Sequence, residues 1–314
     1  MHTSKILVVG SFVQDLTFAT RSFPRPGETI VGTFSTGPGG KGSNQAVAAR
    51  RAGSEVTFIG AVGKDEFAHS VRDFYRNEGI ESPLAEYPDS PTGTAAILFD
   101  ETGQNEIVVA LGANEKLDPT DIPDDQIATA SIVVCQLECN LQAVTSVLQR
   151  AKDHEVTRIL NPAPLREECT AELLREADIL IPNETEFIGL LSKFHGIELD
   201  EAELPKLSPE KFNEYCRKLD CPTVLVTLGK HGVHLSTPES WERIAAVENV
   251  QVVDTTGAGD SFVGAFAAGL QRYNGNLKKA ATFANRAAAI SVTRKGTAPA
   301  MPTLDEIELV AHSS

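Results

Sequence analysis

The sequence predicts a doubly wound α/β protein whose parallel sheet has helices on both faces. Two observations lead to this fold class: short apolar runs rich in β-branched residues recur along the chain, and stretches with helical periodicity lie between them. Strands that alternate with helices form parallel sheets, because each connection crosses back over a face of the sheet. A third observation, two strand-like segments with no helix after them, predicts a second, small sheet.

The strands of the main sheet are expected where apolar residues run without interruption, as they do in strands buried on both faces. They are predicted at 6–9, 56–62, 132–137, 158–160, 179–181, 224–228 and 247–253.

The helices between these strands are expected from apolar residues that recur every three to four positions. Ser43 is the expected N-cap of the first helix, and Gly53 its stop. The acidic stretch 198–210 is expected to be an exposed connection or a surface helix. The predicted helices are 44–51, 66–77, 141–154 and 262–273.

The small sheet is predicted from two hairpins, at 16–34 and 94–110. Their turns are expected at Pro26-Gly27 and at Glu101-Thr102-Gly103. Such a sheet would cover the carboxyl ends of the parallel strands, where open α/β folds bind ligands, and would therefore act as a lid. We expect residues 1–314 to form one domain, with the lid built from about 11–35 and 91–115.

Composition excludes several classes of partner. The 314 residues include 28 Lys and Arg against 43 Asp and Glu, a net charge of −15, which repels nucleic acid and anionic membranes. A nucleotide can still bind through backbone N–H groups and Mg²⁺. The five cysteines lack metal-site spacing and read as reduced thiols. No apolar run approaches about 20 residues and no cleavage signal is present, so a cytoplasmic protein is expected.

The most informative motif is 252–262, a strand end followed by a glycine turn and an apolar helix. Gly257 and Gly259 let the backbone approach a ligand and aim N–H groups at one point, near the positive end of a helix. Asp260 stands at the mouth of this anion hole, where it could accept a hydroxyl proton. Taken alone, the motif fits equally well a tight turn with Asp260 as the helix N-cap.

A second glycine run, 37–42, also opens a helix but matches neither the P-loop nor the dinucleotide fingerprint. Lys41 and Asn44 supply donors that could orient sugar hydroxyls. The alternative, a plain connection, competes poorly, because a run of glycines loses more entropy than an ordinary loop.

Polar residues follow three further strands. Asn183 and Glu186 could hold Mg²⁺ through water beside a triphosphate, although their spacing alone favours a helix capping box. Thr227 and Gly229 could line a nucleotide pocket. Glu138 ends an apolar strand, where a carboxylate needs a partner such as a sugar hydroxyl.

Taken together, these segments resemble the ribokinase, or PfkB, family of carbohydrate kinases, from Gly10 to about Pro302. Four of the motifs look closest to the ribose-phosphorylating members of that family. The motifs are GGKGSNQA at 39–46, DTTGAGDSF at 254–262, CQLE at 135–138, NPAP at 161–164, PNETE at 182–186 and VTRKG at 292–296.

The resemblance implies a role for each matching residue. Asp260 is the implied base, and the amides of Gly257, Ala258 and Gly259 are the implied anion hole. The implied sugar ligands are Asp15, Gly40, Lys41, Asn44, Glu138 and Asp260. Asn183 and Glu186 would organise Mg²⁺ and phosphate, while ATP would contact Thr227, Gly229 and Asn285. K⁺ would bind Asp254, Thr256, Ser291, Arg294 and Gly296, largely through carbonyl oxygens.

The implied activity is ATP-dependent phosphorylation of a sugar hydroxyl, D-ribose to ribose 5-phosphate, by a homodimer joined through the lid. Two positions depart from the family pattern. Val13 replaces an Asn that bonds the sugar, so 2-deoxyribose or a nucleoside is an alternative substrate. Ala300 replaces a Ser near K⁺. A phosphosugar kinase with Arg21, Arg25 or Lys41 on the phosphate, and a non-catalytic sugar- or nucleotide-binding regulator, are further alternatives.

Overall fold

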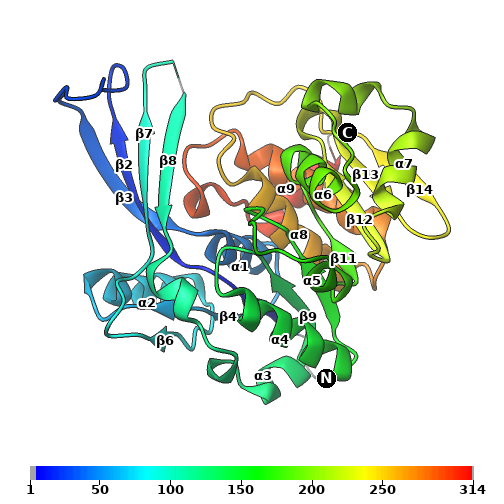
Figure 1. Ribbon diagram of the computed structural model, residues 1–314, viewed down its shortest axis with the longest axis horizontal. Coiled ribbons are helices and arrows are strands. Elements are labelled where there is room, and N and C mark those ends of the chain that lie inside the picture. The colour runs from blue at the N-terminus through cyan, green and yellow to red at the C-terminus, as the bar shows by residue number, and fades with distance from the viewer. Residues whose placement is uncertain (1–4, 103, 313–314) are drawn as a thin grey trace.

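The computed structural model describes residues 5–102 and 104–312, and its centre is an eight-stranded sheet between two layers of helices (Figure 1). The strand order is β14-β13-β12-β11-β10-β9-β1-β4, and the six strands from β12 to β4 pair in parallel. The strands are β1 Lys5–Val9, β4 Val56–Ile59, β9 Ala130–Cys135, β10 Thr157–Leu160, β11 Ile179–Leu180, β12 Thr223–Thr227, β13 Val233–Ser236 and β14 Trp241–Ile244. The predicted fold class is confirmed.

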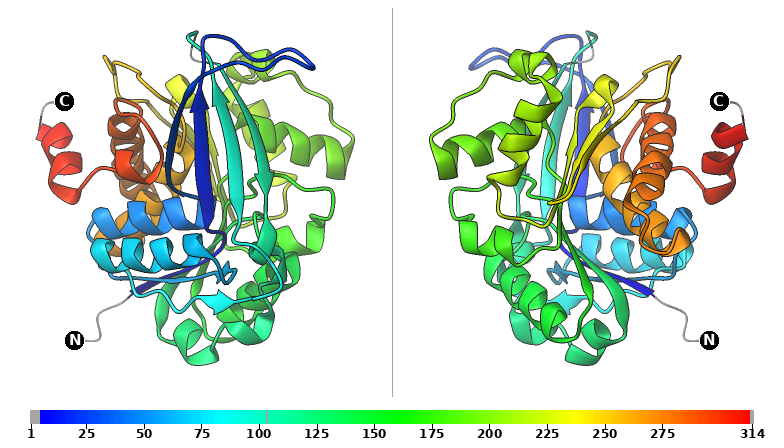
Figure 2. Two further views of the ribbon diagram at one scale, coloured as in Figure 1. Left: turned by 90° about the vertical axis from the view of Figure 1, so that its left-hand side faces the viewer. Right: turned by 90° about the vertical axis from the view of Figure 1, so that its right-hand side faces the viewer.

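Each face of the sheet has its own core. In β1, Ile6 and Val8 pack toward one helix layer, whereas Leu7 and Val9 pack toward the other. Figure 2 shows the two layers on either side of the sheet. The first layer holds α1 Lys41–Arg51, α2 Glu66–Glu78, α8 Ala258–Arg272, α9 Leu277–Ser291 and α10 Leu304–His312. The second holds α3 Asp124–Ala128, α4 Leu141–Asp153, α5 Ala171–Arg175, α6 Glu184–His195 and α7 Pro209–Arg217.

The small sheet, β3-β2-β7-β8, stands apart from the main one at the upper left of Figure 1. Its central strands β2 and β7 pair in parallel, and each has an antiparallel neighbour. Every residue of its edge strand β8 is exposed. The strands are β2 Val13–Ala19, β3 Thr33–Gly39, β7 Thr94–Phe99 and β8 Asn105–Ala110, and a separate pair is formed by β5 Ala61–Val62 and β6 Ala85–Glu86.

Short 3₁₀ helices fill several connections. They are η1 Gly112–Lys116, η2 Pro119–Asp121, η3 Glu201–Lys206, η4 Gly229–His231 and η5 Ala298–Ala300. The acidic stretch 198–210 contains η3 and the first residues of α7, and most of it is exposed, as expected.

The predicted strand 247–253 is wrong. Val252 and Val253 are 60% and 50% exposed, and the backbone N–H of Val253 bonds the carbonyl of Val292 in a connection. The sheet ends instead with β13 and β14, two four-residue antiparallel strands that the sequence reading missed. Their polar residues, such as His234 and Arg243, interrupt the apolar runs by which buried strands are recognised.

The predicted N-cap of the first helix is also wrong. Helix α1 begins at Lys41 after Gly40, which has a φ of 89°, and Ser43 lies buried inside the first turn. A Cβ at Gly40 would lie 2.7 Å from the backbone nitrogen of Val13. The glycine is therefore required both by its backbone conformation and by the close approach of β2.

The hairpin turns are partly as expected. Gly27 has a φ of 83° in the long connection between β2 and β3, and Glu101 and Thr102 lie between β7 and β8. Gly103 lies outside the described residues.

Helices α1 and α8 pack with their backbones almost in contact. A Cβ at Gly264 of α8 would lie 2.3 Å from the carbonyl oxygen of Gln45 and 2.6 Å from the Cβ of Ala48. Small side chains therefore set the separation of the two helices. The N–H of Lys41 bonds Glu138, which follows β9, and Asn44 of α1 bonds Asp260 of α8. The first turns of the two helices therefore meet at the carboxyl edge of the sheet.

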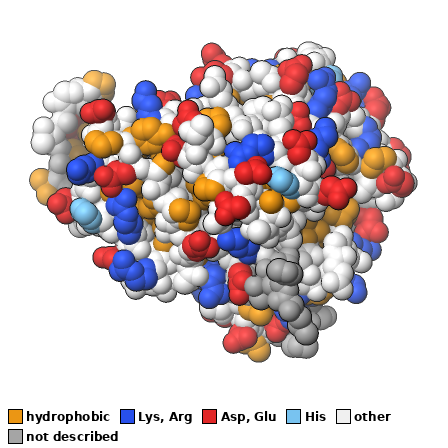
Figure 3. Space-filling model, turned by 90° about the horizontal axis from the view of Figure 1, so that it is seen from below, with side chains coloured by type: hydrophobic (Ala, Val, Ile, Leu, Met, Phe, Trp, Pro, Cys, Tyr) orange, Lys and Arg blue, Asp and Glu red, His pale blue; other side chains and the backbone are white. Residues whose placement is uncertain are grey.

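The surface carries charges of both signs. On the described part of the face seen in Figure 3, Lys and Arg side chains are interspersed with Asp and Glu, and no continuous field of one sign forms. None of the described helices has the length and apolarity needed to cross a membrane.

His234 of β13 is fully buried between aromatic rings. Its ring centroid lies 4.5 Å from that of Phe212 and 5.8 Å from that of Trp241, and neither ring nitrogen has a hydrogen-bond partner among the described residues. Burial, followed by the nearby charges of Arg243 and Arg217, lowers the pKa of His234 from 6.5 to about 4. The imidazole is therefore neutral in the folded protein near pH 7.

We predict that His234 makes the folded state sensitive to acid. Between pH 6.5 and about 4, the unfolded chain binds a proton at His234 that the folded chain does not bind. The free energy of unfolding is therefore undiminished by this residue above pH 6.5 and decreases as pH falls toward 4. Urea unfolding measures this loss. The free energy of unfolding of wild type minus that of His234→Phe should be larger at pH 7 than at pH 4, by on the order of 2–3 kcal/mol. His69→Gln, at an exposed position, is the control. A difference that stays flat with pH contradicts this account.

Candidate functional site

The first turn of α8 forms one wall of a cavity of about 130 Å³ at the carboxyl ends of β10, β11 and β12. The N-cap of α8 is Gly257, with a φ of 75°, so Asp260 lies inside the first turn and is not the cap. Asp260 is 7% exposed. The cavity is lined by Lys41, Asn161, Ala163, Ile181, Asn183, Glu186, Thr227, Gly257, Gly259, Asp260 and Val263.

Both oxygens of the Asp260 carboxylate accept a hydrogen bond from α1. Asn44 Nδ2 donates to Oδ2 and Gln45 Nε2 donates to Oδ1, each at 2.9 Å. Asn44 Oδ1 is buried and has no partner among the described residues, so it remains able to accept a hydroxyl of a ligand. The close packing of α1 on α8 therefore places a fixed carboxylate and a free amide oxygen side by side.

Of the three predicted anion-hole residues, Gly257 and Gly259 line the cavity, and Ala258 does not. The N–H of Ala258 donates to the carbonyl of Thr255 at 3.2 Å. A Cβ on Gly259 would meet no atom within 4 Å, so this glycine leaves an open approach to the helix end. The start of α8 thus presents bare backbone to the cavity, as an anion requires.

Carboxylates converge around Lys41. Burial raises the pKa of Asp15 to about 7, with the nearby charges of Glu138 and Asp260 adding to the rise. Burial also raises the pKa of Glu186. Burial alone would lower the pKa of Lys41, but Asp260, Glu138 and Glu186 together raise it above its ordinary value. The site therefore concentrates negative charge around a single ammonium group.

Glu138 finds its partners within the protein. Its Oε2 accepts from Ser11 Oγ at 2.5 Å and from the backbone N–H of Lys41 at 2.8 Å, and the residue is 6% exposed. This carboxylate ties the end of β9 to the glycine run that opens α1. The expectation that a strand-end carboxylate needs a partner is met without a ligand.

The Asp15 side chain of β2 requires a glycine at position 39, within the glycine run. A Cβ at Gly39 would lie 2.4 Å from the Asp15 carboxylate, so only glycine leaves room for that side chain. Asp15 also faces a second cavity, of about 220 Å³, between the small sheet and the loops that contain Asp254 and Gly296.

Asn183 and Glu186 form the capping box of α6. The N–H of Asn183 donates to Glu186 Oε2 at 2.9 Å, and the N–H of Glu186 donates to Asn183 Oδ1 at 2.8 Å. The interpretation favoured by spacing is therefore confirmed. Both side chains also line the cavity with Asp260, so the cap holds them at the site.

The cavity contains one of the three residues that were expected to contact a nucleotide. Thr227 lines it, whereas Gly229 and Asn285 lie outside it. Gly229 has a φ of 48°, and the amide of Asn285 donates to the carbonyl of Ala245 at 3.1 Å.

The residues expected to hold a cation lie on the loop before α8 and on the segment that begins with the last residue of α9, Ser291. Asp254 Oδ1 accepts from the N–H and the hydroxyl of Thr256, and Oδ2 accepts from the N–H of Gly296 at 3.0 Å. The side chains of Ser291 and Arg294 are engaged with the Ala288 carbonyl and with Glu306. Arg294 can therefore offer a cation only its backbone carbonyl, whereas Ser291 has its carbonyl and the lone pairs of its donating hydroxyl.

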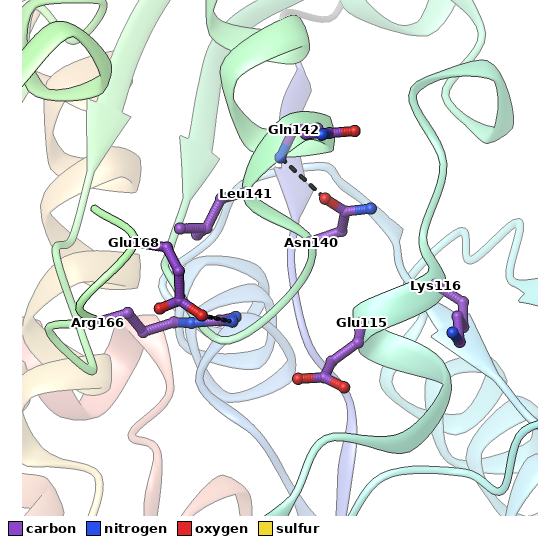
Figure 4. Close-up of a pocket in the computed structure, with 7 residues that line it drawn as sticks. All are labelled: Glu115, Lys116, Asn140, Leu141, Gln142, Arg166 and Glu168. Atoms are coloured by element: carbon purple, nitrogen blue, oxygen red, sulfur yellow. Dashed lines mark hydrogen bonds and ion pairs between the residues drawn. The ribbon is translucent and has the colours of Figure 1, made fainter. Parts of the chain in front are cut away.

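A more open depression, of about 410 Å³, lies elsewhere and contains none of the predicted site residues. Figure 4 shows that its charged side chains are paired or spread out: Arg166 bonds Glu168, and Lys116 extends away from that pair. Its polar groups do not converge on one point, so we assign it no function.

Three polar residues near Asp260 were not singled out by sequence reasoning as ligands: Gln45, Gln136 and Asn161. All are buried, and hydrogen bonds link them. Gln45 lies inside the recognised motif GGKGSNQA, but its contact with Asp260 crosses 215 positions of sequence and follows only from the packing of α1 on α8.

Comparison with known proteins places this geometry in context. The model of the pfkB family carbohydrate kinases matches residues 3–304. The chain is 36% identical to a ribokinase from Staphylococcus aureus over 98% of this chain and 100% of the relative. It is 33% identical to a deoxyribokinase from Salmonella typhi, with 96% of each chain covered. A ribokinase from Arabidopsis thaliana, solved with ribose and ATP, superposes with a TM-score of 0.82 at 29% identity, covering 98% of each chain.

The capping box can be tested apart from any ligand. Asn183→Ala should lower the free energy of unfolding by about 1 kcal/mol, because the Glu186 N–H loses its partner, whereas Asn183→Ser should cost far less, since serine caps equally well. Equilibrium urea unfolding at pH 7 measures both. Equal losses in the two variants would show that Asn183 does not stabilise the protein as a cap.

Proposed function

The chain belongs to the pfkB family of carbohydrate kinases, and from that premise we propose that it transfers the γ-phosphoryl group of ATP to D-ribose, giving ADP and ribose 5-phosphate. The observation that carries this proposal is the Asp260 carboxylate, which two amides hold beside the glycine-containing end of α8 and near Lys41. A regulator that only binds sugar would have no use for a base held in this way.

In the proposed reaction, Asp260 accepts the proton of the sugar hydroxyl while the oxygen of that hydroxyl attacks the γ-phosphorus. The bond between that phosphorus and the β,γ-bridging oxygen breaks, and ADP leaves. The exposed amides at the start of α8, those of Gly257 and Gly259 foremost, stabilise the charge on the phosphoryl oxygens. The Ala258 amide joins them only if it leaves the Thr255 carbonyl.

The proposed sugar ligands come from the small sheet, from the start of α1 and from the segment after β9, and Asn44 among them bonds Asp260 directly. Asp15, from the small sheet, Asn44 and Lys41, from α1, and Glu138, after β9, supply acceptors and donors for hydroxyl groups. Gly40 is a further proposed contact of the sugar. In its ionised form, Asp15 accepts hydrogen bonds from sugar hydroxyl groups. Because its pKa is raised to about 7, we expect sugar affinity to fall as pH drops below 7. The small sheet, as a lid, excludes water that would otherwise hydrolyse ATP.

We propose Mg²⁺ beside the nucleotide phosphates, near Asn183 and Glu186. Among the described residues, no group of three or more His, Cys, Asp or Glu could hold a metal ion by itself. One amide and one carboxylate, from Asn183 and Glu186, suit Mg²⁺, because this ion keeps most of its waters and is bound partly by substrate phosphates. Thr227, Gly229 and Asn285 are the proposed contacts of the rest of ATP.

We propose that K⁺ binds between the loops of Asp254 and Gly296. The donors there are carboxylate and carbonyl oxygens, the hard ligands that such a cation prefers. The buried Ala300 supplies no hydroxyl, so the site relies on the carbonyls of Thr256, Ser291, Arg294 and Gly296. The cation would hold the turn before α8 in place.

The small sheet is also the proposed interface of a homodimer. Its edge strands β3 and β8 expose apolar side chains, and each has a neighbouring strand on one side only within the described part of the protein. Such edges pair readily with another chain. Phe34 is 57% exposed, Val108 71% and Ile107 47%.

A second candidate substrate, 2-deoxyribose, is favoured by Val13. This side chain is 2% exposed and packs with Ala95 and Ile97, so no polar group at this position needs a hydroxyl partner. A site built in this way does not reject a sugar that lacks one hydroxyl.

The kinase proposal predicts ribose-dependent ADP release that requires Asp260. With Mg-ATP and K⁺, Asp260→Asn should lower kcat about 100-fold or more, because the base is gone, while ribose affinity changes little. A coupled ADP assay and calorimetric titration measure the two. A variant that keeps more than about a tenth of wild-type kcat contradicts the role of Asp260, and a wild type that releases no ADP with any pentose favours the regulator.

The choice between the two sugars can be tested at Val13. Val13→Asn should raise the ratio of kcat/KM for ribose over 2-deoxyribose by about tenfold, because the new amide bonds the extra hydroxyl. Val13→Leu, of similar size but without the amide, is the control. A ratio that the amide leaves unchanged would show that position 13 does not set sugar preference.

A further inference from the structure

Four buried polar side chains form a hydrogen-bonded chain that ends on the sheet. Gln136 Nε2 donates to Gln45 Oε1 at 2.7 Å. Gln45 Nε2 donates both to Asp260 Oδ1 at 2.9 Å and to Asn161 Oδ1 at 3.0 Å. Asn161 Nδ2 donates to the carbonyl of Ile181 at 2.8 Å.

The direction of this chain is fixed by chemistry. The Ile181 carbonyl can only accept, so the amide nitrogen of Asn161 faces it and the amide oxygen faces Gln45. A carboxylate on Asp260 can only accept as well. Both neighbours therefore require the nitrogen of Gln45, and its oxygen is left for Gln136.

The side chains of this hydrogen-bonded series are also held in place by packing. Gln45 and Gln136 are fully buried, and Asn161 is 7% exposed. A Cβ at Gly10 would lie 2.0 Å from Gln136 Oε1, so the Gln136 side chain lies directly against the backbone after β1. Hydrogen bonds in such a dry interior are strong, and leaving one unmade is costly.

We propose that Gln45 is a positioning residue for Asp260: it fixes the rotation of the carboxylate and stabilises its ionised form. This inference rests on the proposed function, in which Asp260 is the base. Gln45 has no exposed surface and both of its amide hydrogens are engaged, so it acts on the reaction through the side chains that it bonds, Asp260 and Asn161. Of these two, only Asp260 is the proposed base. Asn44, in contrast, keeps an unpartnered oxygen for a ligand.

The charged groups that face Asp260 come from three other places. Lys41 lies on α1, Asp15 on β2 and Glu186 on α6. All three remain when Gln45 is replaced. A change in the pH profile between wild type and a Gln45 variant therefore reports the lost hydrogen bond.

The test is the pH dependence of kcat at saturating ribose and Mg-ATP in Gln45→Met, which keeps the length of the side chain but cannot donate. We expect kcat to fall about tenfold or more, the KM for ribose to stay within about threefold, and the acid limb to move up by about half a pH unit or more, because the ionised base loses a donor. Gln271→Met is the matched control: Gln271 lies at the far end of α8, bonds Ser54 and Ser131, and its replacement should leave the limb in place.

A wild-type kcat and an unmoved acid limb in Gln45→Met overturn the inference. If that variant does not fold, Gln136→Met decides, because it frees Gln45 Oε1 without touching Asp260: a smaller shift in the same direction supports the inference, and an unmoved limb overturns it. If the wild type is active and the variants keep its kcat and acid limb, this inference alone is contradicted. If the wild type is inactive toward ribose, the proposed function is contradicted, and the inference with it.

Discussion

The site depends on how closely α1 approaches α8. Gly264 has no side chain where any other residue would press a Cβ into the backbone of Gln45, and Ala48 is the small neighbour across the contact. This contact sets the distance over which Asn44 and Gln45 reach Asp260. Two glycine-opened helices thus meet with their first turns at the same edge of the sheet, one presenting amides and the other a carboxylate and bare backbone.

Burying several charges together gives the site its chemical character. Asp15, Glu138, Glu186 and Asp260 share the field of Lys41, and the pKa of Asp15 rises to about 7 because burial and its acidic neighbours disfavour its charge. Each carboxylate is stabilised by specific donors, as when Ser11 and the N–H of Lys41 bond Glu138. Hydroxyl groups of a sugar would add donors where water is scarce, while the start of α8 offers N–H groups to phosphate. The two halves of a phosphoryl transfer therefore meet at Asp260 in the proposed function.

Much of this architecture could be predicted from sequence, and the reason is physical. Strands buried on both faces must be apolar throughout, so six of the seven predicted strands of the main sheet were found. The glycine motifs were informative because glycine is required where backbones approach closely, as at Gly40. The run 247–253 was misleading, because its valines are exposed and bond through the backbone to Val292. Helix α1 starts three residues before the predicted 44 because a glycine with positive φ, and not Ser43, precedes it.

The contacts of Asp260 required the structure. Asn44 and Gln45 are adjacent in sequence, and one pattern cannot show that both side chains converge on a residue more than 200 positions away. The most direct measurement of the central claim is a crystal structure with ribose and a non-hydrolysable ATP analogue. The account predicts an Asp260 oxygen about 2.6–3.2 Å from the attacking hydroxyl, still held by Asn44 and Gln45. A hydroxyl that instead contacts another carboxylate, with Asp260 more than about 4 Å away, would contradict it.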